Sequence, residues 1–242
     1  MKTFNVILLA SLMGFTSIKA SDNQRTSSVA ERQSEETITI EEILDGIKES
    51  AISFNHSLQS LTVKQTATLK STLMGEVKIV KQIRFKHPDI IEQKVIEREE
   101  KVHSGVDMNL EESVSYTLFT EPLLSSLSPD DHNINLVGKK TIKGRSAYLL
   151  KVKPKNKQGD FIDGKLWIDT RDFTLVRFEG KPLKKEDESN VTGGKQIIEY
   201  DKISDKYWLP ILNRRKASWV LVIKLVNEIT YSQYEINTKW GK

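Results

Sequence analysis

The histidines are the first residues to test for chemistry, because an imidazole can bind a metal or transfer a proton near neutral pH. The chain has four of them, far apart in sequence: His56, His87, His103 and His132. None belongs to an H-x-x-x-H or H-E-x-x-H arrangement, the spacing that puts two imidazoles on one face of a helix. A metal site would have to be assembled entirely by the tertiary fold, so the sequence predicts no metal and no cofactor.

Four aspartates between positions 160 and 172 are the other candidates for a calcium or acid–base site. Asp160, Asp163, Asp169 and Asp172 do not follow the spacing of an EF-hand loop. No G-x-S-x-G elbow, Walker loop or G-x-G-x-x-G motif occurs, and the chain has no cysteine to act as a nucleophile. We therefore expect no catalytic residues. A hydrolase would need a triad that the sequence does not show.

Residues 164–180 carry the most informative pattern of the chain. Two β-prone runs, 165–168 and 174–179, flank a polar turn at 169–172. Asp169 and Asp172 suit this turn because short acidic side chains can accept hydrogen bonds from nearby backbone N–H groups. Alternation places one set of apolar side chains on a common face: Leu166, Ile168, Val176 and Phe178. The segment is predicted to be an antiparallel hairpin.

This hairpin resembles the signature hairpin of bacterial LolA-type proteins, the periplasmic lipoprotein carriers and their LolB- and RseB-like relatives. The residues that carry the resemblance are Trp-Ile-Asp at 167–169 and Val-Arg-Phe-Glu-Gly at 176–180. Residues 137–154, 207–210 and 229–237 are similar to other strands of the family. The resemblance covers roughly residues 40–237 and is sharpest over 137–237, whereas residues 100–130 match poorly.

The resemblance implies a mainly β fold with a few helices: a curved, unclosed antiparallel β-barrel capped by α-helices. It also implies a periplasmic carrier or binder of lipoproteins or lipids, which holds acyl chains between the concave sheet and a helical lid. The alternative is a lipid- or stress-sensing regulatory protein of the RseB-like kind that acts on a membrane partner. Such sensors carry a second C-terminal domain, and this chain ends at Lys242, so the carrier is favoured.

The N-terminus is typical of an export signal. Lys2 provides a positive charge, residues 4–15 are predominantly apolar, and residues 18–20 approximate a cleavage site. The apolar run is shorter than the ~20 residues that span a bilayer. We expect a cleaved signal peptide at 1–20, a flexible leader at 21–36 and a single LolA-like domain at 37–242. Because no cysteine follows the signal, a lipid-anchored protein is not expected.

The charge of the chain excludes one class of partner. Formal net charge is +4, and the chain without residues 1–20 has 35 basic against 33 acidic residues. Basic and acidic residues are interspersed, so the electrostatic pattern of a nucleic-acid binder is missing. We expect a monomer whose partners are lipid or acylated protein cargo and donor or acceptor proteins of the inner or outer membrane.

Residues 40–58 have the period of an amphipathic helix. Apolar residues recur at intervals of three and four: Ile43, Ile47, Ala51, Phe54 and Leu58. Thr39 is the expected N-cap, with Glu42 completing a capping box. A second, short helix is expected at 121–127, where a proline lies near the start. The apolar stripe of the first helix must be buried against a sheet.

A period of two predicts a meander of antiparallel strands from residue 61 onward. The expected strands are 61–73, 77–85, 90–99, 133–140, 147–153, 165–168, 174–179, 195–204, 208–216, 219–224 and 228–237. Turns are expected at 192–194 and 226–227, among others. Lys81 is an exception within its strand, because the alternation places this charged residue on the same face as the apolar residues Ile79 and Ile83.

The predicted cargo site needs only burial, which contributes roughly 0.8 kcal/mol for each methylene removed from water. On the helix, the lid residues would be Ile47, Ala51 and Phe54. The sheet residues predicted to face them are Val77, Ile79, Ile83, Phe85, Leu149, Leu166, Ile168, Val176 and Phe178. A slip of one residue in any strand would reverse its assignment, because the side-chain period is two.

Overall fold

The predicted helix is present as α1 (Ile40–Ser57) in the computed structural model of the chain. The capping box is confirmed: the Thr39 hydroxyl accepts a hydrogen bond from the Glu42 backbone N–H, and the Glu42 carboxylate accepts one from the Thr39 N–H. Within the apolar stripe, Ile43 and Ile47 are buried. The helix therefore begins where its sequence signal places it and buries the predicted face.

The structure describes residues 38–86, 89–103, 124, 127–156, 162–181, 191–219 and 223–237. Its strands are β1 (Ser60–Ser71), β2 (Gly75–Lys86), β3 (Asp89–Val102), β4 (His132–Ile142), β5 (Arg145–Pro154), β6 (Gly164–Asp169), β7 (Leu175–Gly180), β8 (Val191–Ile203), β9 (Tyr207–Trp219) and β10 (Ile223–Ile236). The signal peptide and leader expected at 1–20 and 21–36 lie outside the described residues. So does the helix expected at 121–127, apart from Leu124 and Leu127.

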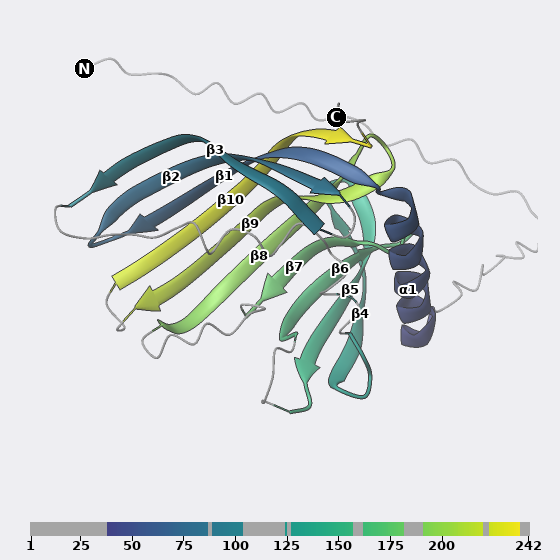
Figure 1. The fold of residues 1–242 in the computed structure, drawn as a ribbon. Coiled ribbons are helices and arrows are strands. Elements are labelled where there is room, and N and C mark those ends of the chain that lie inside the picture. Colours follow the sequence, from purple (N-terminus) through teal and green to yellow (C-terminus); the bar gives the residue numbers. More distant parts are fainter. Residues whose placement is uncertain are drawn as a thin grey trace, which may run out of the picture. The chain divides into compact units, whose positions relative to one another are not determined.

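These strands form one antiparallel sheet in the order β3-β2-β1-β10-β9-β8-β7-β6-β5-β4. Figure 1 shows that the sheet is strongly curved, and its two edge strands, β3 and β4, do not pair with each other. The predicted fold class is confirmed, since the sheet is a curved, unclosed half-barrel with a helix packed on it. Edge strand β3 is rich in charged residues such as Glu97 and Arg98, which discourage pairing with other chains.

The pairing of β1 with β10 is the one link of the sheet that is not between strands consecutive in the chain. Its register runs from Leu61 opposite Ile236 to Ser71 opposite Leu225, with a slip between Thr62 and Lys64. The N-terminal hairpins thereby join the C-terminal strands in a continuous sheet.

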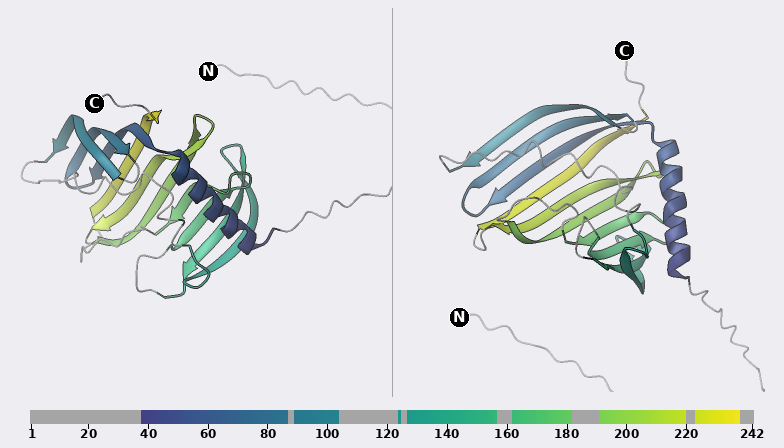
Figure 2. Two further views of the ribbon diagram at one scale, coloured as in Figure 1. Left: turned by 45° about the vertical axis from the view of Figure 1, so that its right-hand side comes forward. Right: turned by 60° about the horizontal axis from the view of Figure 1, so that its bottom comes forward.

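Helix α1 crosses one face of this sheet, termed here the inner face (Figure 2). Its N-terminal half packs on β5–β8 through Ile43, Leu44 and Ile47. At its C-terminal end, Phe54 and Leu58 pack against side chains of β1, β2, β9 and β10. One helix thus bridges the two halves of the sheet, as its apolar stripe requires.

Two predicted turns are wrong. Val226 and Asn227, expected to form a turn, lie within β10 and pair on both sides with β1 and β9. Pairing on both edges overrides the turn preference of asparagine. Residues 192–194 were also expected to turn, but they lie in β8, where the register against β9 slips between Thr192 and Lys195. The glycines there accommodate a bulge instead.

The turn of the signature hairpin is confirmed and reaches α1. The Asp169 carboxylate accepts hydrogen bonds from the backbone N–H groups of Arg171 (2.8 Å) and Asp172 (3.0 Å). The next residue, Phe173, stacks on Tyr148 with ring centroids 6.1 Å apart. Its ring lies against Gly46 of α1, where a Cβ would be only 2.5 Å from the nearest ring carbon. A glycine in mid-helix therefore lets the hairpin turn contact the helix.

Asp172 links the same turn to β8 and β9. Its Oδ2 accepts hydrogen bonds from Lys202 Nζ at 2.8 Å and from Trp208 Nε1 at 2.9 Å. The Arg145 guanidinium lies over the Trp208 ring, 4.9 Å from its centroid. Partial burial raises the pKa of Asp172, but the hydrogen bonds from Lys202 and Trp208 outweigh it and hold the pKa below its ordinary value.

We expect Gly46→Ala to destabilise the protein although alanine is the better helix former. The gain in helix propensity is about 1 kcal/mol, and overpacking against the Phe173 ring costs roughly 1–3 kcal/mol. A net loss of about 1 kcal/mol in the free energy of unfolding should appear in urea denaturation. In a Phe173→Ala background the same substitution should become stabilising. A Gly46→Ala variant more stable than the parent chain would contradict the contact.

We expect the Asp172 carboxyl to titrate below about 3.9, the value of an unfolded chain. A depressed pKa means that the charged form stabilises the fold above that value, and that this contribution is lost as the pH falls through the folded-state pKa. A carbon-13 NMR titration should show the pKa rising in both Trp208→Phe and Lys202→Gln. Lys216→Gln, which removes an exposed lysine of β9, is the control. Titration of Asp172 at or above about 3.9 in the parent chain would refute the arrangement.

Candidate functional site

The predicted lid and the signature hairpin meet in a first apolar cluster on the inner face. Ile47 is buried there with Leu166, Ile168, Val176 and Phe178, none more than 3% exposed. The pairing of β6 with β7 slips by one residue, so that Leu175 rather than Val176 lies opposite Ile168. Both side chains are nevertheless buried in the cluster. Five of the predicted site residues are thus brought together.

A second apolar cluster lies under the C-terminal end of α1. Ile83 and Phe85 of β2 are buried in it, and Phe54 of α1 packs against it. Phe54 also meets the ring of Tyr207 edge-on, with centroids 6.3 Å apart. Ala51, one turn earlier on the helix, is half-buried. The predicted residues of this group also lie together, but in a different cluster from the first.

The remaining predicted residues lie elsewhere. Val77 and Ile79 are buried in a third, small cluster with Leu69, Met74 and Val102. The assignment of Leu149 to the inner face is wrong. Leu149 lies opposite Trp167, whereas Leu150 lies opposite the buried Leu166. Because neighbouring residues of a strand point to opposite faces, Leu149 belongs to the outer face.

Sequence reasoning missed the true inner-face residues of β5, Leu150 and Val152, which are both fully buried. Their signal was present, because the exposed lysines Lys151 and Lys153 alternate with them. The run of four apolar residues before Lys151 contains no polar residue to show which of its side chains point outward. Trp208 of β9 is also buried in the first cluster, and its indole N–H ties it to the signature turn.

A polar seam interrupts the apolar inner face. Lys81 is 5% exposed and lies directly opposite Gln65, which is 1% exposed. Farther along the sheet, Gln196 Nε2 donates a hydrogen bond to Asn213 Oδ1 at 3.0 Å. Burial of a cation is costly unless polar groups surround it. The anomaly seen in the sequence at Lys81 is therefore a real feature of this face, and it separates Ile79 from Ile83.

The buried tyrosines of the inner region cannot act as bases at ordinary pH. Burial raises the pKa of Tyr200, and the neighbouring Tyr231 raises it further. Burial likewise raises the pKa of Tyr234, whose hydroxyl donates a hydrogen bond to the Pro210 carbonyl oxygen. Both phenols are neutral far above neutral pH. They supply apolar surface and hydrogen bonds, which suits binding rather than proton transfer.

Among the described residues, no three histidine, aspartate or glutamate side chains are grouped as metal ligands. His132 is a buried structural residue, whose Nε2 accepts a hydrogen bond from the Ile162 backbone N–H at 3.2 Å. Within the same described ranges, no helix is both long and apolar enough to cross a membrane. The chemistry that this face offers is noncovalent burial of apolar groups beside a few polar ones.

No family model and no curated protein sequence matches the chain. Several solved structures do. A domain from Vibrio parahaemolyticus named for outer membrane lipoprotein sorting matches with a TM-score of 0.41 and 12% identity, over 82% of this chain and 94% of that one. A DUF1329 family protein from Desulfovibrio piger matches with a TM-score of 0.37 and 10% identity, over 82% and 95%.

A LolA superfamily protein from Nitrosomonas europaea matches with a TM-score of 0.36 and 15% identity, over 81% of this chain and 94% of that one. The architecture itself rests on the sheet order, the unpaired edges and the helix across the inner face. The chain therefore has the fold class that the sequence predicted, a curved and unclosed antiparallel sheet with a helix across its inner face.

Proposed function

We propose that this protein is a periplasmic carrier or binder of lipoproteins or other lipids, with acyl chains held between the inner face and α1. The observation that carries the proposal is an inner face with two large apolar clusters spanned by a single helix, which packs unevenly along its length. Ile43 and Ile47 are buried at 0% and 3% exposure. Ala51 and Phe54, farther along the same stripe, are only half-buried.

This uneven packing favours one part of the face as the acyl site. The first cluster is a filled core, since its members on β6 and β7 are fully buried against the helix. An acyl chain would enter beside Ala51 and Phe54, over Ile83 and Phe85 of the second cluster. Displacement of Phe54 would widen the site without unfolding the first cluster, which keeps the N-terminal half of α1 in place.

The energetics of such a site suit a carrier. One long acyl chain offers about 10 kcal/mol of gross driving force, at roughly 0.8 kcal/mol for each methylene. A membrane or a second carrier solvates the chain equally well, so transfer needs no covalent step. The protein would then be no enzyme, and its partners would be acylated cargo and membrane donor or acceptor proteins. A regulatory protein of the RseB-like kind could use the same face for sensing.

We expect Ala51→Trp to weaken binding of a fluorescent fatty acid by about tenfold or more, because the indole fills space for two or more methylenes. Ile52→Trp is the matched control. Ile52 is the next residue of α1 and is 57% exposed, so a tryptophan there should leave the dissociation constant unchanged. Urea denaturation of each variant shows whether a loss of binding comes from a blocked site, with stability unchanged, or from a destabilised fold.

Two results would contradict the proposed site. The first is saturable fatty-acid binding that Ala51→Trp and Ile52→Trp affect equally. The second is the absence of binding by the parent chain after extraction of any bound lipid. If a pull-down then recovered one membrane protein and no lipid, a regulatory binding protein would replace the carrier.

A further inference from the structure

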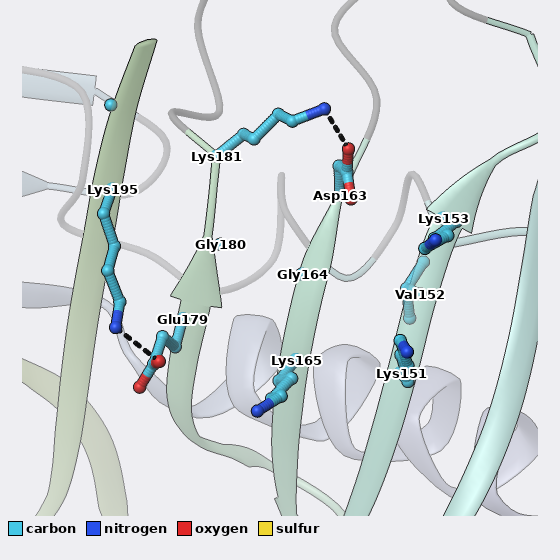
Figure 3. A pocket seen from close by; sticks show the side chains of 11 residues that line it. Lys151, Val152, Lys153, Asp163, Gly164, Lys165, Glu179, Gly180, Lys181 and Lys195 are labelled. Atoms are coloured by element: carbon cyan, nitrogen blue, oxygen red, sulfur yellow. Dashed lines mark ion pairs between the residues drawn. The ribbon is translucent and has the colours of Figure 1, made fainter.

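A hollow of about 290 Å³ lies on the outer face of the sheet, over β5–β8 (Figure 3). Two rows of charged side chains line it: Lys151, Lys153, Lys165, Lys181, Lys195, Asp163 and Glu179. We term it the lysine trough. Lys151 lies opposite Lys165 in register, one residue from the inner-face pair Leu150 and Leu166. The trough is therefore on the opposite face from the proposed acyl site.

The floor of the trough is backbone. Between the two rows run Val152, Gly164 and Gly180, which lie opposite one another on adjacent strands. A Cβ on Gly180 would lie 2.4 Å from the Asp163 carbonyl oxygen and 2.7 Å from the Phe178 ring. A Cβ on Gly164 would be 2.6 Å from the Glu179 carbonyl oxygen. The two strands approach closely here, and the Phe178 ring supports them from the inner side.

Both carboxylates of the trough are already paired. Lys195 Nζ lies 2.7 Å from Glu179, and Arg177 Nη2 lies 3.0 Å from the same carboxylate. Hydrogen bonding from Lys195 holds the pKa of Glu179 below its ordinary value. Lys181 Nζ lies 2.5 Å from Asp163. Figure 3 shows the Lys195–Glu179 pair at the left and the Lys181–Asp163 pair at the top.

Three lysines of the trough are left without such a partner. Lys151, Lys153 and Lys165 form no ion pair within the part of the chain that the structure describes. Lys151 and Lys165 are also cross-strand neighbours, and like charges at such positions destabilise a sheet. Elsewhere on the sheet an exposed cation is matched, as Arg84 is by Glu92 at 2.8 Å across β2 and β3. Among the described residues, the trough thus keeps three lysines without a partner carboxylate, at a cost to the fold.

We propose that the lysine trough binds a phosphate group. A phosphomonoester carries close to two negative charges and three acceptor oxygens, which matches three ammonium donors better than a single carboxylate does. Asn133 and Asn135 of β4, exposed and in register with Lys153 and Lys151, extend the donors of the two rows. The phosphate group can come from a soluble phosphomonoester or from the phosphomonoester headgroup of phosphatidic acid. The proposal does not rest on the acyl site.

The first experiment is a titration of the full chain with inorganic phosphate at constant ionic strength, monitored through the amide signals in NMR spectra. We expect saturable shifts centred on residues 151–153, 163–165 and 179–181. Lys151→Gln/Lys165→Gln should weaken phosphate binding by at least about tenfold, since hydrogen bonds to charged groups are stronger than neutral ones. It should also raise the melting temperature without phosphate, because a like-charge pair is removed.

The matched control is Lys94→Gln/Lys101→Gln, which removes the same charge from two exposed lysines of edge strand β3. It should leave phosphate binding unchanged. A second arm measures co-sedimentation with phosphatidic acid vesicles and with phosphatidylcholine vesicles in phosphate-free buffer. Sedimentation with phosphatidic acid alone, lost in the Lys151/Lys165 variant and competed by phosphate, would identify the headgroup as the source. Phosphate binding without sedimentation would identify a soluble phosphomonoester.

Two outcomes would overturn the proposal. One is the absence of saturable binding in both arms. The other is an equal loss of phosphate binding in the trough variant and in the β3 control, which would show that binding depends only on the net charge of the protein. Neither result depends on fatty-acid binding, so the failure of the trough and the failure of the acyl site can be told apart.

Discussion

The pairing of β1 with β10 is the interaction on which the rest of the structure depends. It joins the first three strands to the last seven, and only two residues, Leu58 and Gln59, separate the end of α1 from the start of β1. Asn237 secures this junction: its Oδ1 accepts hydrogen bonds from the Gln59 and Ser60 N–H groups, and its Nδ2 donates one to the Ser57 carbonyl oxygen. Once β1 lies beside β10, α1 must end there and run back across the inner face.

That constraint gives the helix two different halves. The N-terminal half is held by the first cluster and by the contact between Gly46 and Phe173. The C-terminal half is held by Leu58 and the Asn237 junction, while Phe54, one turn before Leu58, is half-buried against the second cluster. A helix fixed at both ends with a looser stretch between is suited to admit an apolar guest. The strands pair with one another along the whole sheet, so the curved sheet does not depend on the helix for its strand pairing.

Local patterns predicted most of this fold. The capping box at Thr39, the turn at Asp169 and the long alternating strands each depend on near neighbours. The failures have tertiary causes. Asn227 lies in a strand because β1 and β9 pair with it on both sides. Leu149 was assigned to the wrong face because, within an unbroken run of apolar residues, the sequence does not show which of them point to the inner face. The lysine trough was not foreseen, since it gathers residues from four strands and depends on which face each strand presents.

The central claim is that acyl chains occupy the inner face beside Phe54, and native mass spectrometry of the protein purified from its own host tests it most directly. Organic extraction of the same sample identifies whatever is bound. The account predicts a stoichiometric acylated species that is lost when the site is filled by a bulky side chain. A protein that is empty as purified, and that also fails to bind a fluorescent fatty acid, would contradict it.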